Sequence, residues 1–289
     1  MTKICRKTIT LICVVCLLAG LAVNAGAAEA FEKYELPAEY STEIPLYVNG
    51  IRVGSGILVE DATYVSLRTF CEAMDRDIQV NWDSSTLTAV AEMEGLVLEA
   101  TLGDKYITAN DRCFYVPNGV MYWNGSIIAP IAELSKAFGA TVIWDEEYWT
   151  IDIYVEEISP VVPAEEFYPA EDFKWLCQVI HAESGNQPLA GMIAVGNVVL
   201  NRVADPTCPD TVYDVVFDRR YGVQFSVTEN GTIYLTPNEL SIVAAKICME
   251  GYDVAGASLF FVNPDIGATS WFTNNRTFVA SIGDHDFYA

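Results

Sequence analysis

The sequence predicts an α+β protein of two domains, in which a small β-rich module precedes a mostly helical one that also contains a β-hairpin. Three observations lead to this prediction. Three prolines and four acids between 156 and 170 are typical of a linker. A motif ahead of this linker occurs twice, and apolar residues after it recur at helical spacing. We therefore place the domains at 44–155 and 171–289, with a shorter linker at 31–43.

Residues 1–30 have the composition of a cleaved secretory signal peptide. Three bases precede an apolar run from Ile9 to Val23, and small residues follow the run. The run has about 15 residues, fewer than the ~20 that a membrane-spanning helix needs. An uncleaved membrane anchor is therefore the weaker alternative, and we expect a secreted protein.

The net charge of the chain argues against an anionic partner. There are 39 acids and 16 bases, which give a formal charge of −23. Such a chain repels nucleic acids and anionic membrane surfaces, so we expect neither as a partner. Five cysteines follow residue 30, and Cys177 and Cys248 lie on apolar helical stripes, where buried thiols are expected. Nothing in the sequence indicates an oligomeric state.

The module at 44–155 contains a weak internal duplication. In the first copy, Val65–Arg68 leads into a helix-like stretch and then into two strands that end near Ala91. The second copy repeats this order from Ala129 to Val155. Alternating apolar residues and the turn Asn49-Gly50 predict hairpins that flank one short helix in each copy.

This module resembles the copper amine oxidase-like N-terminal domain, a small α+β unit often attached to secreted enzymes of Gram-positive bacteria. The family name suggests copper, but the two histidines of the chain, His181 and His285, both lie outside the module. Copper favours imidazole ligands, so we expect no copper site here. We expect a folded spacer or a contact with the cell wall or a spore protein.

The module at 171–289 reads as helical. Asp172 is the expected N-cap of its first helix, and Thr236 begins a capping box for its third. Alternating residues on both sides of Asn230-Gly231 predict a β-hairpin over 225–235. The three helices are expected from Asp172 to Glu183, from Pro188 to about Val203, and from Thr236 to Gly251.

Glu183 is the residue in this module with the clearest chemical potential. It is expected at the end of an apolar helix, just before a loop, 184–188, that would open a cleft. A carboxyl group held against apolar walls loses hydration, which raises its pKa and keeps it protonated as a general acid near neutral pH. The alternative is a solvated helix-end glutamate, since most glutamates are surface charges.

A set of short motifs surrounds Glu183 and continues to the end of the chain. The motifs are His181–Pro188, Gly191–Val195, Val198–Val203, Gln224–Ser226, Thr236–Glu239, Leu259–Pro264 and Ile282–Tyr288. Together they resemble the spore cortex-lytic, SleB-type cell-wall hydrolase family over nearly all of 171–289. The resemblance implies a compact, mostly helical fold related to lytic transglycosylases and lysozyme-like enzymes. It also implies cleavage of peptidoglycan glycan strands next to N-acetylmuramic acid, with Glu183 as the catalytic residue.

The sequence departs from this family at one informative position. Members often carry a second glutamate where this chain has Gln187. A hydrolytic glycosidase needs a second carboxylate, whereas one glutamate can serve a lytic transglycosylase as acid and then as base. The departure favours the transglycosylase route. Hydrolysis with a carboxylate from elsewhere, such as Asp265 or Glu229, stays open, as does a non-catalytic wall-binding or spore-assembly protein.

Several polar and aromatic residues of the module suit a carbohydrate cleft, because sugars stack on aromatic rings and take hydrogen bonds at their rims. His181 has a structural alternative, a packed or hydrogen-bonded helix residue, which we favour over catalysis. His181, His285 and an acid such as Asp284 could serve a zinc amidase, but their spacing is weak evidence, so we expect no metal and no cofactor. The expected substrate contacts are Gln187, Asn201, Arg202, Gln224, Ser226, Tyr234, Asn263, Trp271, His285 and Tyr288.

Overall fold

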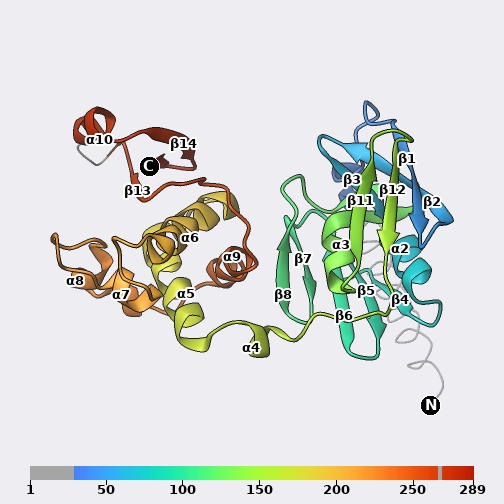
Figure 1. The fold of residues 1–289 in the computed structure, drawn as a ribbon, viewed down its shortest axis with the longest axis horizontal. Coiled ribbons are helices and arrows are strands. Elements are labelled where there is room, and N and C mark those ends of the chain that lie inside the picture. The colour runs from blue at the N-terminus through green and yellow to red at the C-terminus, as the bar shows by residue number, and fades with distance from the viewer. Residues whose placement is uncertain (1–28, 266–268) are drawn as a thin grey trace, which may run out of the picture. The chain divides into compact units, whose positions relative to one another are not determined.

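The computed structural model describes residues 29–265 and 269–289, and the chain divides into two compact units (Figure 1). One unit comprises the described residues to Asn110 together with Phe114–Val161, and the other comprises Asp111–Cys113 together with Val162–Ala289. The predicted signal peptide and its membrane-anchor alternative lie almost entirely outside the described residues. Within the described ranges, no helix is both long and apolar enough to cross a membrane.

The N-terminal unit contains two sheets and the short helices α2 and α3. The seven-stranded sheet has the order β11-β12-β1-β2-β3-β10-β9, and the five-stranded sheet runs from β4 to β8 in sequence order. β1 pairs in parallel with β12 and antiparallel with β2. The elements are β1 Glu43–Val48, β2 Ile51–Val59, β3 Ala62–Ser66, α2 Leu67–Met74, β4 Gln79–Asp83, β5 Thr88–Met93, β6 Leu96–Thr101, β7 Tyr106–Ala109, β8 Arg112–Tyr115, β9 Met121–Trp123, β10 Ser126–Pro130, α3 Ile131–Ala137, β11 Thr141–Asp145 and β12 Thr150–Tyr154.

The structure bears out the duplication in this unit. The order β3-α2-β4-β5 recurs as β10-α3-β11-β12, with one short helix per copy. The hairpin turns share one hydrogen bond: Asp83 accepts from the backbone N–H of Ser85 at 2.8 Å, and Asp145 accepts from that of Glu147 at 2.9 Å. Four residues after each aspartate the backbone has a positive φ. Each copy therefore has the same aspartate-capped turn between its last two strands.

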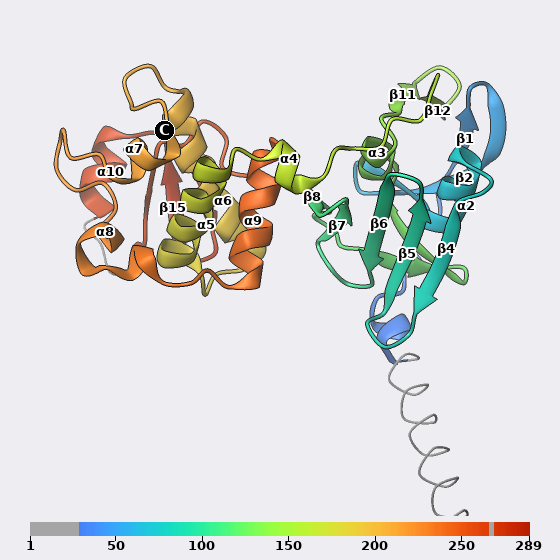
Figure 2. The ribbon, with the colours of Figure 1, turned by 90° about the horizontal axis from the view of Figure 1, so that it is seen from below.

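The C-terminal unit is built on three helices, α5, α6 and α9, which lie side by side (Figure 2). A three-stranded antiparallel sheet, β13-β15-β14, covers α6. Phe287 of β15 packs there into a buried cluster with Ala194, Val195 and Val198. The elements are α4 Ala164–Phe167, α5 Ala170–Ser184, α6 Leu189–Ala204, α7 Val212–Val216, α8 Val227–Asn230, the 3-10 helix η1 Thr232–Tyr234, α9 Glu239–Met249, β13 Phe260–Val262, α10 Thr269–Asn275, β14 Phe278–Ile282 and β15 His285–Tyr288.

Gly196 allows the three helices to pack closely. A Cβ atom at this position would lie 2.6 Å from the Sγ atom of Cys248 on α9 and 2.8 Å from the Cδ1 atom of Ile180 on α5. Ile180 and Cys248 are themselves buried, so neither side chain has room to retreat. Cys177 and Cys248 are buried thiols, as predicted.

The hairpin predicted over 225–235 is wrong. This segment forms α8 and the 3-10 helix η1, separated by Gly231, which has a φ of +80° and ends α8. Two isolated strands are marginal without a third strand or a packing surface. Here Phe225, Val227 and Ile233 gain more by burial against the helices. The hairpin of this unit is instead formed by β14 and β15.

Two predicted helix caps are also displaced. α5 begins directly after Pro169, and the carboxylate of Asp172 accepts a hydrogen bond from the backbone N–H of Val212 at 3.1 Å, a tertiary contact. α9 has Asn238, not Thr236, as its N-cap, and the Asn238 side chain accepts from the N–H of Ser241 at 2.8 Å. Each helix still starts within three residues of its predicted cap. The predicted caps are displaced because a polar side chain near a helix start can bond to another partner instead.

We expect Gly196→Ala to lower the free energy of unfolding of the C-terminal unit. Alanine favours a helix by about 1 kcal/mol over glycine, but forcing a methyl group into this packed site costs about 1–3 kcal/mol. Thermal unfolding of the full chain measures the change. A double variant with Cys248→Ala, which removes the sulfur facing the new methyl group, should lose less than the sum of the two single losses. Stabilisation by Gly196→Ala would contradict this account of the helix packing.

Candidate active site

Glu183 lies in the last turn of α5, and local contacts fix the end of that helix. The backbone N–H of Gly185 donates to the carbonyl of His181 at 2.9 Å, and the fully buried hydroxyl of Ser184 donates to the carbonyl of Ile180 at 2.8 Å. A Cβ atom at Gly185 would lie 2.5 Å from the His181 carbonyl oxygen, so only glycine fits there. The helix therefore ends directly after Glu183, as the sequence predicts.

The carboxyl group of Glu183 is partly buried. Within the described part of the chain, no hydrogen bond or ion pair reaches it. Burial raises its pKa from 4.5 to about 7, which confirms the predicted direction. A carboxyl group with this pKa is about half protonated at neutral pH, where it can donate a proton and then act as a base.

Gln187 joins the loop after Glu183 to the turn between β14 and β15. It is buried, its Oε1 atom accepts from the backbone N–H of Asp284 at 2.9 Å, and its Nε2 atom donates to Oδ2 of Asp284 at 2.9 Å. A glutamate here would bring a second negative charge against the Asp284 carboxylate and would have no N–H to donate. The side chain expected to contact substrate is thus engaged within the protein, which accounts for glutamine at this position.

His181 is hydrogen-bonded within the domain. Its Nδ1 atom accepts from the backbone N–H of Asn238 at 3.3 Å, while the Asn238 side chain donates to the carbonyl of Gly185 at 2.9 Å. These contacts tie the start of α9 to the end of α5. They agree with the structural interpretation of His181 that the sequence favours.

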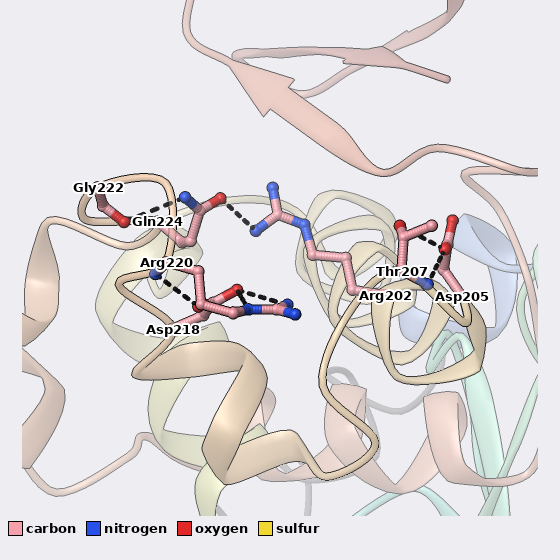
Figure 3. A network of polar contacts seen from close by, with 7 residues as sticks. All are labelled: Arg202, Asp205, Thr207, Asp218, Arg220, Gly222 and Gln224. Atoms are coloured by element: carbon pink, nitrogen blue, oxygen red, sulfur yellow. Dashed lines mark hydrogen bonds and ion pairs between the residues drawn. The ribbon is translucent and has the colours of Figure 1, made fainter.

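Asn201, Arg202 and Gln224 act first as connectors in the structure. Asn201 donates to the carbonyls of Gly256 and Ser258, at 2.7 and 3.0 Å. Arg202 donates through Nε to the carbonyl of Leu259 at 2.7 Å. Figure 3 shows its second bond, from Nη1 to Oε1 of Gln224 at 3.3 Å. They attach α6 to the segment that enters β13 and to the loop before α8.

A cavity of about 710 Å³ lies in the C-terminal unit, and Arg202, Gln224 and Trp271 are among its lining residues. Glu183 is not one of them. Three of the predicted substrate-contacting residues therefore share one cavity, although they come from α6, the loop before α8, and α10.

The other predicted contact residues are dispersed. Ser226 and Tyr234 are exposed, and the side chain of Asn263 accepts from the backbone N–H of Asp265 at 2.9 Å. His285 and Tyr288 are buried in β15, and burial lowers the pKa of His285. These five roles stay predictions.

The sequence did not reveal which residues surround the predicted substrate contacts. Asp284 occurs in the last motif, but its bond to Gln187 spans 97 positions. Arg220, Tyr221 and Arg276 line the cavity without belonging to any motif. Bases are scarce in 171–289, so each arginine there could have been singled out by its rarity alone. Across 29–265 and 269–289, no group of three His, Cys, Asp or Glu side chains is arranged to hold a metal ion.

Comparison with known proteins finds a family match in each half of the chain. Residues 186–288 match the family described as Cell Wall Hydrolase, and residues 47–153 match the Copper amine oxidase N-terminal domain. Both resemblances noted in the sequence are thereby confirmed. Glu183 lies three residues before the first of these segments, since that segment starts at 186.

The chain is similar to spore cortex-lytic enzymes. It is 35% identical to the Bacillus cereus enzyme over 120 residues, which are 42% of this chain and 45% of that enzyme. It is 31% identical to the Bacillus subtilis enzyme over 116 residues, which are 40% of this chain and 37% of that enzyme. It thus spans less than half the length of these relatives. Among solved structures, it is 36% identical to the catalytic domain of the germination-specific lytic transglycosylase SleB from Bacillus anthracis, covering 44% of this chain and all of that one, with a TM-score of 0.39.

Glu183 should make the stability of the fold depend on pH. Between pH 4.5 and 7 the unfolded chain loses the Glu183 proton while the folded chain keeps it, so the free energy of unfolding falls as pH rises. Relative to Glu183→Gln, the parent should lose about 3 kcal/mol across this range, since the pKa differs by 7 − 4.5 units. Urea unfolding of both proteins at several pH values measures the difference.

The control for this experiment is Glu171→Gln, an exposed glutamate in the first turn of the same helix. Its stability relative to the parent should change little across the same range. Parallel curves for the parent and Glu183→Gln would show that Glu183 is not buried as described.

Proposed function

We propose that the chain, whose residues 186–288 match the Cell Wall Hydrolase family, is an enzyme that cleaves the glycan strands of peptidoglycan. The observation that carries this proposal is the raised pKa of Glu183 at the end of α5, directly ahead of the family segment. A carboxyl group that is protonated near neutral pH suits the protonation of a glycosidic oxygen. The similarity to spore cortex-lytic enzymes supports the same substrate class.

In the proposed mechanism, Glu183 acts twice at the glycosidic bond of N-acetylmuramic acid. It first donates its proton to the leaving oxygen as the bond from C1 to that oxygen breaks. The resulting carboxylate then takes the proton from the C6 hydroxyl of the same sugar while O6 bonds to C1. This restores the acid and leaves a 1,6-anhydro end. Because the C6 hydroxyl is already tethered near C1, its effective concentration can reach about 10⁵–10⁸ M.

Hydrolysis is the second candidate, and it needs a second carboxylate near Glu183. Glu229, one of the acids that the sequence offers for this role, is exposed and ion-paired with Arg219 at 3.2 Å. Asp284, in contrast, is held against the loop after Glu183 by Gln187. A carboxylate can activate water when it lies about 6.5–9.5 Å from the acid. If Asp284 acts in this way, water rather than O6 attacks C1.

The location and remaining partners follow from this function. We place the protein outside the cell, in the wall or spore envelope of a Gram-positive bacterium, with residues 1–30 as its export signal. The N-terminal domain then contacts the wall or a spore protein. Glu183 acts alone in this mechanism, so the enzyme needs no metal or cofactor.

Glu183→Gln should lower the rate of glycan cleavage by about 10²–10⁴-fold, because the amide keeps the shape of the side chain but has no transferable proton. Release of soluble fragments from purified peptidoglycan measures the rate. In the parent, the rate should fall as pH rises through about 7, where Glu183 loses its proton. A Glu183→Gln variant that folds and retains activity within a few-fold of the parent would refute the assignment, and the absence of cleavage by the parent would favour a wall-binding protein.

The products distinguish the two mechanisms. Digestion in oxygen-18 water should give unlabelled 1,6-anhydromuramic ends, about 18 mass units lighter than hydrolysed ends, because no water is added. Mass spectrometry of the released fragments reads both the mass and the label. Asp284→Asn should still yield anhydro ends. Label at the new C1 position in most products would replace the transglycosylase route with hydrolysis, and loss of that product in Asp284→Asn would identify the base.

A further inference from the structure

The 710 Å³ cavity of the C-terminal unit has a charge opposite to that of its surroundings. Residues 171–289 contain 14 acids and 6 bases, yet three of these bases line the cavity against two acids, Asp205 and Asp218. The bases are Arg202, Arg220 and Arg276. Half of the bases of this domain therefore gather at one cavity, and that cavity favours an anionic ligand.

Both acids are already engaged (Figure 3). Asp205 accepts from the backbone N–H and the hydroxyl of Thr207, at 2.8 and 2.7 Å. Asp218 is ion-paired with Arg220 at 2.9 Å and also accepts from the backbone N–H of Arg220. Neither carboxylate bonds to Arg202.

Arg202 is a buried cation held by neutral groups. It is 9% exposed, and its hydrogen bonds go to the carbonyl of Leu259 and the amide of Gln224. Among the described residues, no carboxylate is ion-paired with it. Buried charges in proteins are normally paired, because an unpaired one pays the full cost of lost hydration. That cost appears in its pKa, which burial lowers, with Cys208 and Asp218 opposing the effect.

Flat aromatic surfaces accompany the arginines. The guanidinium of Arg276 lies 4.4 Å from the ring centre of Phe260 and 5.7 Å from that of Trp271. Tyr221 and Trp271, both exposed, also line the cavity. Arginine forks bind carboxylates through two parallel hydrogen bonds, and neighbouring rings can take the apolar face of a sugar. The cavity therefore suits a carboxylate attached to a bulky group.

We infer that this cavity binds a carboxylate carried by a muramoyl residue of the glycan, either on its lactyl arm or on its stem peptide. The inference rests on the proposed function for its substrate. Arg202 lies at the C-terminal end of α6, whereas Glu183 precedes the N-terminal end. With a rise of 1.5 Å per residue, the thirteen steps from Leu189 to Arg202 span about 20 Å. The cavity is thus a separate subsite that holds a muramoyl residue away from the reacting bond.

The test is a binding measurement with the full chain carrying Glu183→Gln, which prevents turnover. Four fragments are titrated by calorimetry: a disaccharide with a free lactyl carboxylate, its methyl ester, a disaccharide tetrapeptide, and the same peptide with methylated carboxylates. Each free acid that uses the cavity should bind roughly tenfold more tightly than its ester, because the ester loses a charge-assisted hydrogen bond. The pair that shows the difference identifies the lactyl arm or the peptide as the source.

Variants locate the site. Arg276→Gln, at an exposed side chain, should weaken binding of the acid about tenfold and leave binding of the ester unchanged. Arg202→Lys keeps the charge but loses the fork, and should also weaken binding of the acid. Arg219→Gln is the matched control, since Arg219 is exposed, pairs with Glu229 and does not line the cavity. It should change neither affinity.

Equal affinities for acid and ester in both pairs would overturn the inference. The inference would also be overturned if Arg276→Gln weakened binding of the acid and the ester equally, or if Arg219→Gln weakened binding of the acid to the same extent. Cleavage by the parent chain is measured in parallel. If the parent cleaves glycan but no acid binds more tightly than its ester, the subsite is refuted and the proposed enzyme activity stands. If an acid binds more tightly but the parent does not cleave, the subsite stands and the enzyme activity is refuted.

Discussion

The close approach of α5, α6 and α9 is the constraint on which the C-terminal domain depends. It requires the absence of a side chain at Gly196, where Ile180 and Cys248 meet the helix. It also requires the short loop 185–188, which returns the chain from α5 directly into α6. Because the helices cannot slide past each other without a clash, the end of α5 is fixed and Glu183 stays partly buried. The raised pKa of its carboxyl group is a consequence of this packing, and not of a neighbouring charge.

Hydrogen bonds between distant segments then complete the domain around α6. Gln187 fixes the turn between β14 and β15 at one end of the helix, and Asn201 and Arg202 fix the approach to β13 at the other. Each bond joins residues more than 50 positions apart in the sequence. Since a buried polar group costs energy when it is left unpaired, these bonds hold the sheet against α6 in one register. The two ends of α6 consequently carry the two chemically distinct places of the domain, the acid and the arginine-lined cavity.

The acidic composition of the chain makes its few arginines informative. In a domain with more than twice as many acids as bases, a surface arginine normally finds a carboxylate, as Arg219 does with Glu229. Arg202 is buried without one. The same reasoning applies to Gln187, where glutamine replaces a glutamate that the Asp284 carboxylate would repel. At both positions the local electrostatics, and not the overall charge of −23, determine which side chain the site tolerates.

By itself, the sequence determined the two domains, the duplicated β-rich unit, the helices α5, α6 and α9, and the position of Glu183 at a helix end. These features depend on periodicity, turn residues and contacts within a few positions, all of which are local in the chain. Tertiary structure alone decided that 225–235 contains the short helices α8 and η1 and no hairpin, since the packing surface offered to Phe225 and Ile233 is built from distant helices. It also decided that Gln187 bonds to Asp284 and that Arg202, Arg220 and Arg276 share one cavity. No pattern in the sequence encodes these contacts, because they form only when segments far apart in the chain are brought together by the burial of the same core.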